Sequence, residues 1–365
     1  MTKVSVLMSS YNHQSIISEA IQSVLNQSFQ DWEFLIIDDC STDESFLTAK
    51  KFENQDSRIK VFKSPYNRGM VQNTNELILA SKGEYIAVIN SDDYWEEKKL
   101  EKQVDFLDNN PEYGACFTSV NMINEGGKIV LNKKKNPFID TNKNRYEWLN
   151  HWFYYGNCVC YPSSLVRKLC YEKVGLFNPA FICLLDFDMW TRICLAGYEI
   201  HILPEKLTNF RLMNNEANLS GLNKSTRIRC FLEAPRVLYN YSKIKNFEEF
   251  IKIFPKYSKK VNNSYEGYFY LIDMIIDFFD LKKIPNERNI KNFGLNFLHQ
   301  KVYENPETIA ILTKDFSFSF KNYLKITYLF PNGLYFVSFK KLKILYFKSL
   351  LIMLVAFLML LTIKI

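Results

Sequence analysis

The sequence predicts an α/β protein whose core is a doubly wound, mostly parallel sheet. Patterns typical of strands and of helices alternate over the first 120 residues, with short connections between them. Two strand patterns end in adjacent acids, Asp38-Asp39 and Asp92-Asp93. Because ligands of open α/β sheets bind outside the carboxyl ends of the strands, both acidic pairs are expected at the same rim. A hydrophobic content of 47% and an aromatic content of 16% supply a core and exclude a globally disordered chain.

Short apolar runs predict five strands in this first part of the chain. They cover residues 4–8, 33–37, 59–62, 85–90 and 114–118. The helices between them are predicted from apolar residues at helical spacing and from capping residues. They cover residues 16–25, a segment that starts near Ser41-Thr42, and residues 71–81 and 96–108.

Beyond residue 120 the patterns are less regular. Turns are expected around Gly126-Gly127 and through the aromatic cluster of residues 148–155. A helix is predicted from about Asp186 to just before Gly197, and a strand over residues 199–203. From about residue 224 the chain reads as mostly helical, lysine-rich and aromatic, which predicts a helical C-terminal extension.

The charge is distributed unevenly. Residues 1–110 carry 11 Lys and Arg against 18 Asp and Glu, whereas the remaining residues carry 35 against 21. Residues 316–365 contain seven lysines and no acidic residue. Such a bias favours an anionic partner, either nucleic acid or an acidic membrane surface. Since no nucleic-acid-binding motif accompanies the lysines, we expect no nucleic-acid partner.

Several function classes are excluded by missing motifs. The sequence contains no G-x-G-x-x-G, no G-x-x-x-x-G-K-[ST] and no G-x-S-x-G motif. A dinucleotide-binding enzyme, a P-loop nucleotidase and a serine hydrolase of the G-x-S-x-G type are therefore excluded. No secretory signal opens the chain, and the eight scattered cysteines fit a reduced, cytoplasmic setting. The C-x-C pair at Cys158 and Cys160 lacks the paired spacing of a zinc site.

Paired acids after a strand suit Mg²⁺ or Mn²⁺, since these hard cations prefer carboxylate oxygens and keep positions open for phosphate oxygens. A structural alternative is that Asp92 caps a helix beginning near Tyr94 while Asp93 is solvated. The second acidic pair, Asp38-Asp39, and the nearby Asp43 make the functional reading the stronger one.

Five segments together resemble the family 2 glycosyltransferases with a GT-A fold. In order along the chain they are residues 4–12, 37–43, 67–75, 83–93 and 185–192. The resemblance covers about residues 3–215. It implies a GT-A domain over residues 1–215, with a nucleotide-sugar-binding half at 1–110 and an acceptor half at 111–215. A helical, basic region at 216–338 and a tail at 339–365 then complete the chain.

The resemblance also implies roles for the donor side of the site. Tyr11, Asp38 and Asp39 would surround the nucleobase, as a stacking face and hydrogen-bond acceptors. Asp92 would approach the ribose and the metal, and Asp93 would be the direct ligand of the cation on the diphosphate.

On the acceptor side, the resemblance implies that Asp186 is the catalytic base of an inverting displacement. Asp188 is the alternative base, although Arg192 lies at i+4 to pair with it, which favours a structural Asp188. Arg211 is a possible phosphate or acceptor contact, or a surface residue.

The sequence departs from the family pattern at four places. Ser9-Ser10 stand where Pro is common, Cys40 where Gly is usual, and Leu185 where Glu often precedes the base. The fourth is Arg211-Leu212-Met213, where the family has Arg-x-His. Because a thioether is a poor ligand for a hard cation, metal binding would rest on the acidic pair, the diphosphate and water.

The tail contains an uncharged apolar run at residues 350–363, preceded by four lysines and several aromatic residues. This run is shorter than the roughly 20 residues that span a bilayer. The combination favours attachment to an anionic membrane surface, on the cytoplasmic face; a helix buried against another domain is the alternative.

The favoured hypothesis is a glycosyltransferase that moves one sugar from a nucleotide donor, expected to be UDP-linked, to a glycan or lipid-linked acceptor of a cell-surface polymer. A catalytically silent sugar-nucleotide-binding or scaffold subunit is the alternative from another class. A nucleotidyltransferase is disfavoured, since Ser9-Ser10-Tyr11-Asn12 does not provide a basic, Gly-rich triphosphate loop.

Overall fold

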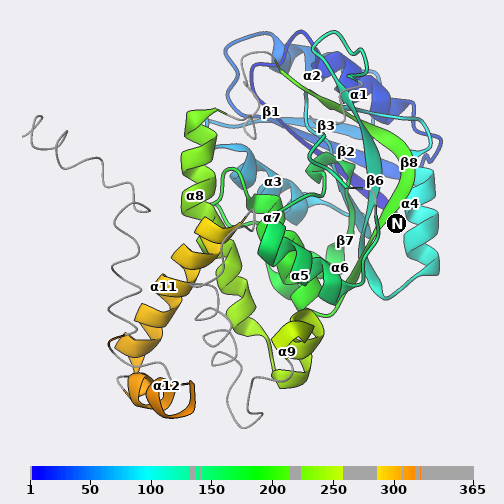
Figure 1. Cartoon of the computed structure of the whole chain (residues 1–365). Helices are drawn as coiled ribbons and strands as arrows, with labels where there is room; N and C mark the ends of the chain where they lie inside the picture. The colour runs from blue at the N-terminus through cyan, green and yellow to red at the C-terminus, as the bar shows by residue number, and fades with distance from the viewer. Residues whose placement is uncertain are drawn as a thin grey trace, which may run out of the picture. The chain divides into compact units, whose positions relative to one another are not determined.

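A computed structural model describes residues 2–130, 136–139, 141–213, 223–257, 286–305, 307–316 and 321. The chain forms two compact units, Met1–Gly294 and Leu295–Ile365, and each is described by itself. The first unit contains the sheet and most of the described helices (Figure 1). In the second unit, the described part comprises the end of α11 (Glu287–Glu304), which crosses the boundary, and α12 (Thr308–Phe316).

Eight strands of the described chain form one sheet. They are β1 (Val4–Ser10), β2 (Trp32–Asp38), β3 (Ile59–Lys63), β4 (Tyr85–Val88), β5 (Tyr94–Trp95), β6 (Tyr113–Ile123), β7 (Leu165–Arg167) and β8 (Glu199–Arg211). Their order is β3-β2-β1-β4-β7-β6-β8-β5. The first four pair in parallel, as do β6 and β8, whereas β7 and β5 run antiparallel to their neighbours. The predicted mostly parallel sheet is therefore confirmed.

The helices of the first unit connect these strands and extend the chain beyond the sheet. They are α1 (Ile17–Leu25), α2 (Ser45–Glu53), α3 (Met70–Ala80), α4 (Lys99–Asn109), α5 (Arg145–Tyr155), α6 (Lys168–Val174), α7 (Leu185–Leu195), α8 (Lys224–Leu238) and α9 (Phe247–Ile253). The helices that follow β8 confirm the expected helical C-terminal part.

The apolar spacing that predicts the helices places their buried faces. In α1, Ile17, Ala20, Ile21 and Val24 are buried and join the core cluster beneath β1 and β2. Around α7 the core is aromatic: Trp190 meets Phe117 of β6 edge-to-face, with ring centroids 4.8 Å apart. This packing holds the middle of α7 against the sheet.

Several elements differ from the sequence expectation. Strands β6 and β8 run to Ile123 and Arg211, well beyond the predicted ends, because they pair with each other along nearly their whole length. The aromatic cluster expected in turns forms α5, whose N-terminus carries an Asn144–Glu147 capping box. The short strand β7 has no counterpart among the predictions.

The helix expected from residue 96 begins at Lys99, because Tyr94-Trp95 form β5 and pair with β8. The structural alternative for Asp92, capping a helix at Tyr94, is therefore wrong.

The predicted membrane-attachment tail, residues 339–365, lies outside the described residues. Within the described ranges, no helix combines the length and the apolarity needed to cross a bilayer. The domain boundaries at residues 110, 215 and 338 stay predictions.

Gly83 enables the close approach of β4 to β1, because a Cβ at this position would lie 2.4 Å from the backbone nitrogen of Ser5. We expect Gly83→Ala to lower the free energy of unfolding by about 3 kcal/mol, since the backbone must shift. Gly126→Ala is the matched control: its Cβ would meet its nearest neighbour, Asn124 Oδ1, at 3.5 Å. Urea denaturation that finds both variants equally stable would contradict this account of the β1–β4 approach.

Candidate functional site

The loops after β1 and β2 are tied together at the carboxyl end of the sheet. Asn12 donates its backbone N–H to Ser41 Oγ (2.9 Å), and its side-chain oxygen accepts the N–H of Thr42 (2.9 Å). Asn12 and Cys40 both adopt the left-handed conformation, with φ of 54° and 64°. Cys40 therefore stands where Gly would be unstrained, as the departure from the family pattern suggests.

Tyr11 and Asp38 lie at this junction with contrasting environments. The Tyr11 ring is 44% exposed, which leaves an aromatic face open to solvent. Asp38 is buried, and its Oδ1 accepts the N–H of Ser41 at 2.9 Å. Its Oδ2 has no hydrogen-bond partner among the described residues. A buried carboxylate oxygen without a donor is costly, so a donor from a ligand would stabilise it.

Asp39 accepts hydrogen bonds from the backbone of the loop between β3 and α3. Its two carboxylate oxygens accept the N–H groups of Arg68 (3.0 Å) and Gly69 (2.9 Å). The residue is buried, and its own N–H donates to the carbonyl of Ser10 (2.7 Å). Asp39 thus fixes the loop that enters α3.

Asp92 and Asp93 occupy the turn after β4, which we call the acidic turn. Asp93 is buried; its Oδ1 accepts the N–H of Arg211 (2.8 Å) and its Oδ2 accepts the side-chain amide of Asn90 (2.9 Å). Asp92 is half-buried. Burial raises the pKa of Asp92, and burial together with the Asp92 charge raises the pKa of Asp93 well above its usual range.

His13 links the turn that carries Asp92 and Asp93 to the segment that follows β2. Its Nδ1 lies 2.7 Å from Ser91 Oγ, and its backbone N–H donates to Ser45 Oγ at 2.8 Å. The acids after β2 and after β4 are therefore brought to the same rim, as predicted. Sequence reasoning did not single out His13, because no pattern relates it to a turn 78 residues away.

Arg211, at the end of β8, binds the acidic turn, the Glu125 backbone and α1. Its Nε donates to the carbonyl of Asp92 (2.7 Å), Nη1 to the carbonyl of Glu125 (2.6 Å), and Nη2 pairs with Glu19 of α1. The side chain is 2% exposed. The arginine proposed as a phosphate or acceptor contact is thus occupied by protein partners and supports the acidic turn.

Asp186 lies in the first turn of α7 and is buried. Its Oδ2 accepts the side-chain amide of Asn157 (2.7 Å), and its Oδ1 accepts the N–H of Phe187 (2.7 Å). Burial raises the pKa of Asp186 to about 7 despite these two hydrogen bonds. A carboxyl group that ionises near neutral pH can accept a proton from a hydroxyl.

The segment at Asn157–Cys160 lies beside Asp186, which accepts the side-chain amide of Asn157. Burial, and then the charges of Asp93 and Asp186, raise the pKa of the Cys160 thiol. Asn157, which sequence reasoning missed, positions the Asp186 carboxylate from this same segment.

Asp188, the alternative base, has structural partners. It pairs with Arg192 at 2.8 Å, as its i,i+4 spacing predicts, and accepts the amide of Asn240 at 2.8 Å. Arg192 in turn donates to the carbonyls of Val174 and Gly175, which anchors α7 to the end of α6. These contacts favour Asp186 over Asp188 as the base.

Glu233 of α8 holds the segment that leads into α7. Its carboxylate accepts three consecutive backbone N–H groups, from Ile182 (3.0 Å), Cys183 (3.0 Å) and Leu184 (2.8 Å). It is 5% exposed. Donors of a helix N-terminus require such acceptors, so Glu233 fixes the turn before Asp186 from a distant helix. Sequence reasoning missed it.

The acidic turn fits a hard divalent cation in its donor chemistry. Asp92 and Asp93 are adjacent carboxylates whose ionisation is opposed by burial, and a cation would relieve that cost. Over the described ranges, no group of three or more His, Cys, Asp and Glu side chains is arranged to hold a metal by itself. A cation here would need oxygen ligands from the substrate and water.

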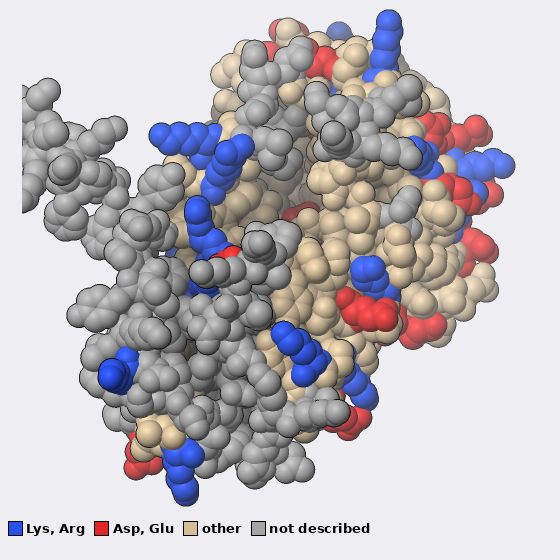
Figure 2. Space-filling model, viewed as in Figure 1, with Lys and Arg blue, Asp and Glu red and all other residues tan. Residues whose placement is uncertain are grey.

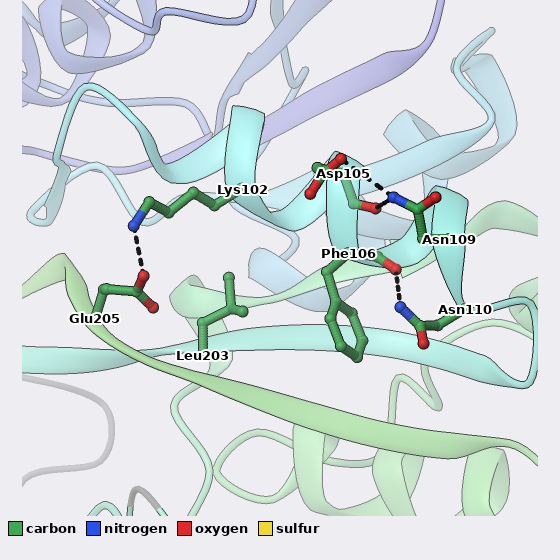
Figure 3. A pocket seen from close by; sticks show the side chains of 7 residues that line it. All are labelled: Lys102, Asp105, Phe106, Asn109, Asn110, Leu203 and Glu205. Atoms are coloured by element: carbon green, nitrogen blue, oxygen red, sulfur yellow. Dashed lines mark hydrogen bonds and ion pairs between the residues drawn. The ribbon is translucent and has the colours of Figure 1, made fainter.

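A surface hollow of about 320 Å³ lies elsewhere, between α4 and β8 (Figure 3). The Lys102–Glu205 pair crosses it beside Leu203. Leu203 belongs to the first half of β8, away from the end that carries Arg211, so we assign this hollow no part in the site. Figure 2 shows an acidic side chain recessed in a depression on one face of the molecule.

Comparisons with known proteins find similarity to glycosyltransferases. Residues 5–170 match the model described as Glycosyl transferase family 2. TuaG of Bacillus subtilis, a putative teichuronic acid biosynthesis glycosyltransferase, is 29% identical over 217 residues, 58% of this chain and 80% of TuaG. WfaP of Escherichia coli, a UDP-Glc:alpha-D-GlcNAc-diphosphoundecaprenol beta-1,3-glucosyltransferase, is 25% identical over 247 residues, 63% of this chain and 91% of WfaP. The structure of S. aureus TarS 1-349 in complex with UDP-GlcNAc has a TM-score of 0.54 at 18% identity, covering 92% of this chain and 93% of that one.

Replacing Glu233 tests its hold on the segment before α7. We expect Glu233→Ala to lower the free energy of unfolding by roughly 3 kcal/mol, because three N–H groups lose their acceptor, and Glu233→Gln to cost less. Glu248→Ala is the control, since Glu248 is an exposed glutamate whose partner is Lys252. Chemical denaturation in which Glu233→Ala is no less stable than Glu248→Ala would refute this role.

Proposed function

We propose that this chain, whose residues 5–170 match the model described as Glycosyl transferase family 2, is a glycosyltransferase that moves a single sugar from a UDP-linked donor to a hydroxyl group with inversion at the anomeric carbon. The GT-A fold that the resemblance implies is confirmed by the likeness to TarS. The observation that carries the mechanism is Asp186: a buried carboxyl with a pKa of about 7, oriented by a hydrogen bond from Asn157.

The donor base is proposed to bind at the junction of the β1 and β2 loops. The exposed Tyr11 ring offers a stacking face, and the unpartnered Oδ2 of Asp38 offers an acceptor for a base N–H. Asp39 contributes by holding the Arg68–Gly69 backbone in place. Asp92 is proposed to approach the ribose as well as the cation.

Asp92 and Asp93 are proposed to hold Mg²⁺ or Mn²⁺, which would neutralise negative charge on the diphosphate as it leaves. Asp92 is the more accessible of the two, whereas both Asp93 oxygens already accept protein donors. We therefore assign the main contact to Asp92 and a supporting contact to Asp93, the reverse of the emphasis that the sequence suggests.

In the transfer step, Asp186 accepts the proton of the acceptor hydroxyl as that oxygen attacks the anomeric carbon from the face opposite the diphosphate. A new glycosidic C–O bond forms, the bond from the anomeric carbon to the phosphate oxygen breaks, and the electron pair leaves with UDP. The hydrogen bonds from Asn157 and Phe187 keep the carboxylate in place for this proton transfer.

The acceptor is proposed to be a glycan or a lipid-linked glycan of cell-surface polymer synthesis. The names of two relatives support this class, since one is assigned to teichuronic acid biosynthesis and the other acts on a diphosphoundecaprenol-linked sugar. Lys224 and Arg227, exposed in the first turn of α8, provide positive charge suited to an anionic acceptor. A position at the cytoplasmic face of a membrane, through the tail, is part of the same proposal.

Asp186→Asn is the direct test of the base. We expect UDP release from a UDP-sugar in the presence of acceptor to fall by at least about 100-fold, while the affinity for UDP stays unchanged, because only the proton acceptor is lost. Asp105→Asn, at an exposed position of α4, is the matched control. Transfer that persists in Asp186→Asn would assign the base elsewhere.

The pH dependence provides an independent test. Asp186 acts as a base only when ionised, so kcat/KM should rise about tenfold per pH unit below pH 7 and level off above it, following its pKa of about 7. Steady-state kinetics at fixed ionic strength and saturating cation measure this profile. A rate that is flat between about pH 5.5 and 8 is incompatible with Asp186 as the base.

A further inference from the structure

Two cysteines meet where α8 packs on the segment before α7. Cys183 lies three residues before Asp186, and Cys230 lies on α8, on the same side of that helix as Glu233. Arg229 Nε lies 3.2 Å from the Cys183 sulfur and Glu233 Oε2 accepts the Cys183 N–H at 3.0 Å, so Cys183 lies against the turn of α8 on which Cys230 stands between these two residues. Both residues are partly exposed, and both are reduced in the structure.

The surroundings of Cys183 favour its thiolate. Arg229 Nε donates to the Cys183 sulfur at 3.2 Å, and the residue directly precedes the N-terminus of α7, where the helix dipole favours negative charge. The hydrogen bond from Cys230, with the contribution of Arg229, lowers the pKa of Cys183 to about 6, although burial opposes it. The same pairing raises the pKa of Cys230, so one thiol of the pair is a nucleophile and the other keeps its proton.

The other cysteines are differently placed. Five of them are buried: Cys116, Cys158, Cys160, Cys170 and Cys194. Burial raises the pKa of each of these five thiols, which makes them unreactive toward oxidants. Cys40 is partly exposed, as Cys183 is, and provides an internal comparison for exposure alone.

We propose that Cys183 and Cys230 are an oxidisable thiol pair, a modification site at which a peroxide forms a disulfide between α8 and the segment before α7. The inference concerns reactivity of the chain itself and does not depend on the proposed glycosyl transfer. Intracellular redox-sensing thiols share these features: a stabilised thiolate, access to solvent and a resolving cysteine beside it.

The chemistry balances with hydrogen peroxide as the oxidant. The Cys183 thiolate attacks one peroxide oxygen, the O–O bond breaks, and hydroxide leaves to become water, which gives a sulfenic acid. The Cys230 sulfur then attacks the Cys183 sulfur; the S–S bond forms, the S–O bond breaks, and the departing hydroxide takes the Cys230 proton as a second water. The pair loses two electrons and two protons, and the peroxide is reduced to two waters.

The test uses the full chain, reduced and then freed of reductant. It is treated with graded hydrogen peroxide, remaining thiols are alkylated, and peptides are mapped by mass spectrometry. We expect the Cys183–Cys230 cross-linked peptide to form first, at least about tenfold faster than any modification of Cys40, with the five buried cysteines unmodified. Oxidation of Cys40 at the same rate, or no cross-link between Cys183 and Cys230, would overturn the proposal.

Two variants separate the steps. Cys230→Ser should leave Cys183 trapped as a sulfenic acid that a dimedone probe labels, because the resolving thiol is missing. At pH 5, Arg229→Gln should slow disulfide formation by up to about tenfold and at pH 7 only about twofold, because raising the Cys183 pKa by one unit lowers the thiolate fraction by these factors. Thermal unfolding measured on each variant shows whether it is folded. A folded Cys230→Ser that takes up no dimedone would count against Cys183 as the nucleophile.

Discussion

Two like charges held side by side at the rim of the sheet are the constraint on which the rest of this site depends. Burial and mutual repulsion oppose the ionisation of Asp92 and Asp93. The backbone N–H of Arg211 and the amide of Asn90 offset part of this cost at Asp93. Because that N–H comes from the last residue of β8, the strand must run far beyond its apolar first half. The geometry of the acidic turn therefore depends on the length of β8.

A second buried acid imposes a similar cost on the acceptor side. The pKa of Asp186 is raised to about 7, so its ionisation destabilises the folded state as the pH rises through that value. The fold therefore retains an unfavourable group where proton transfer is proposed to need it. Asn157 donates to the Asp186 carboxylate, and Glu233 of α8 holds the backbone before α7. The position of this one carboxylate therefore depends on residues from distant parts of the chain.

The sequence predicts the half of the site that follows from local pattern. Strand periodicity and parallel order suffice to place Asp38 and Asp92 at one rim. The supporting contacts were not predictable in this way, since Glu233 reaches Cys183 across 50 residues and Arg211 reaches Asp93 across 118. The α5 helix was predictable in principle, because Asn144 and Glu147 form a recognisable capping box. The two-residue β5 and three-residue β7 are set by tertiary pairing that no local pattern encodes.

The acidic turn is proposed to bind the diphosphate of a nucleotide through a divalent cation. Isothermal titration of UDP into the full chain, with and without Mn²⁺, compares wild type with Asp92→Asn. We expect Mn²⁺ to strengthen UDP binding and Asp92→Asn to weaken the Mn²⁺-dependent binding by at least about tenfold. UDP binding of equal strength with and without Mn²⁺, or unaffected by Asp92→Asn, would contradict this proposal.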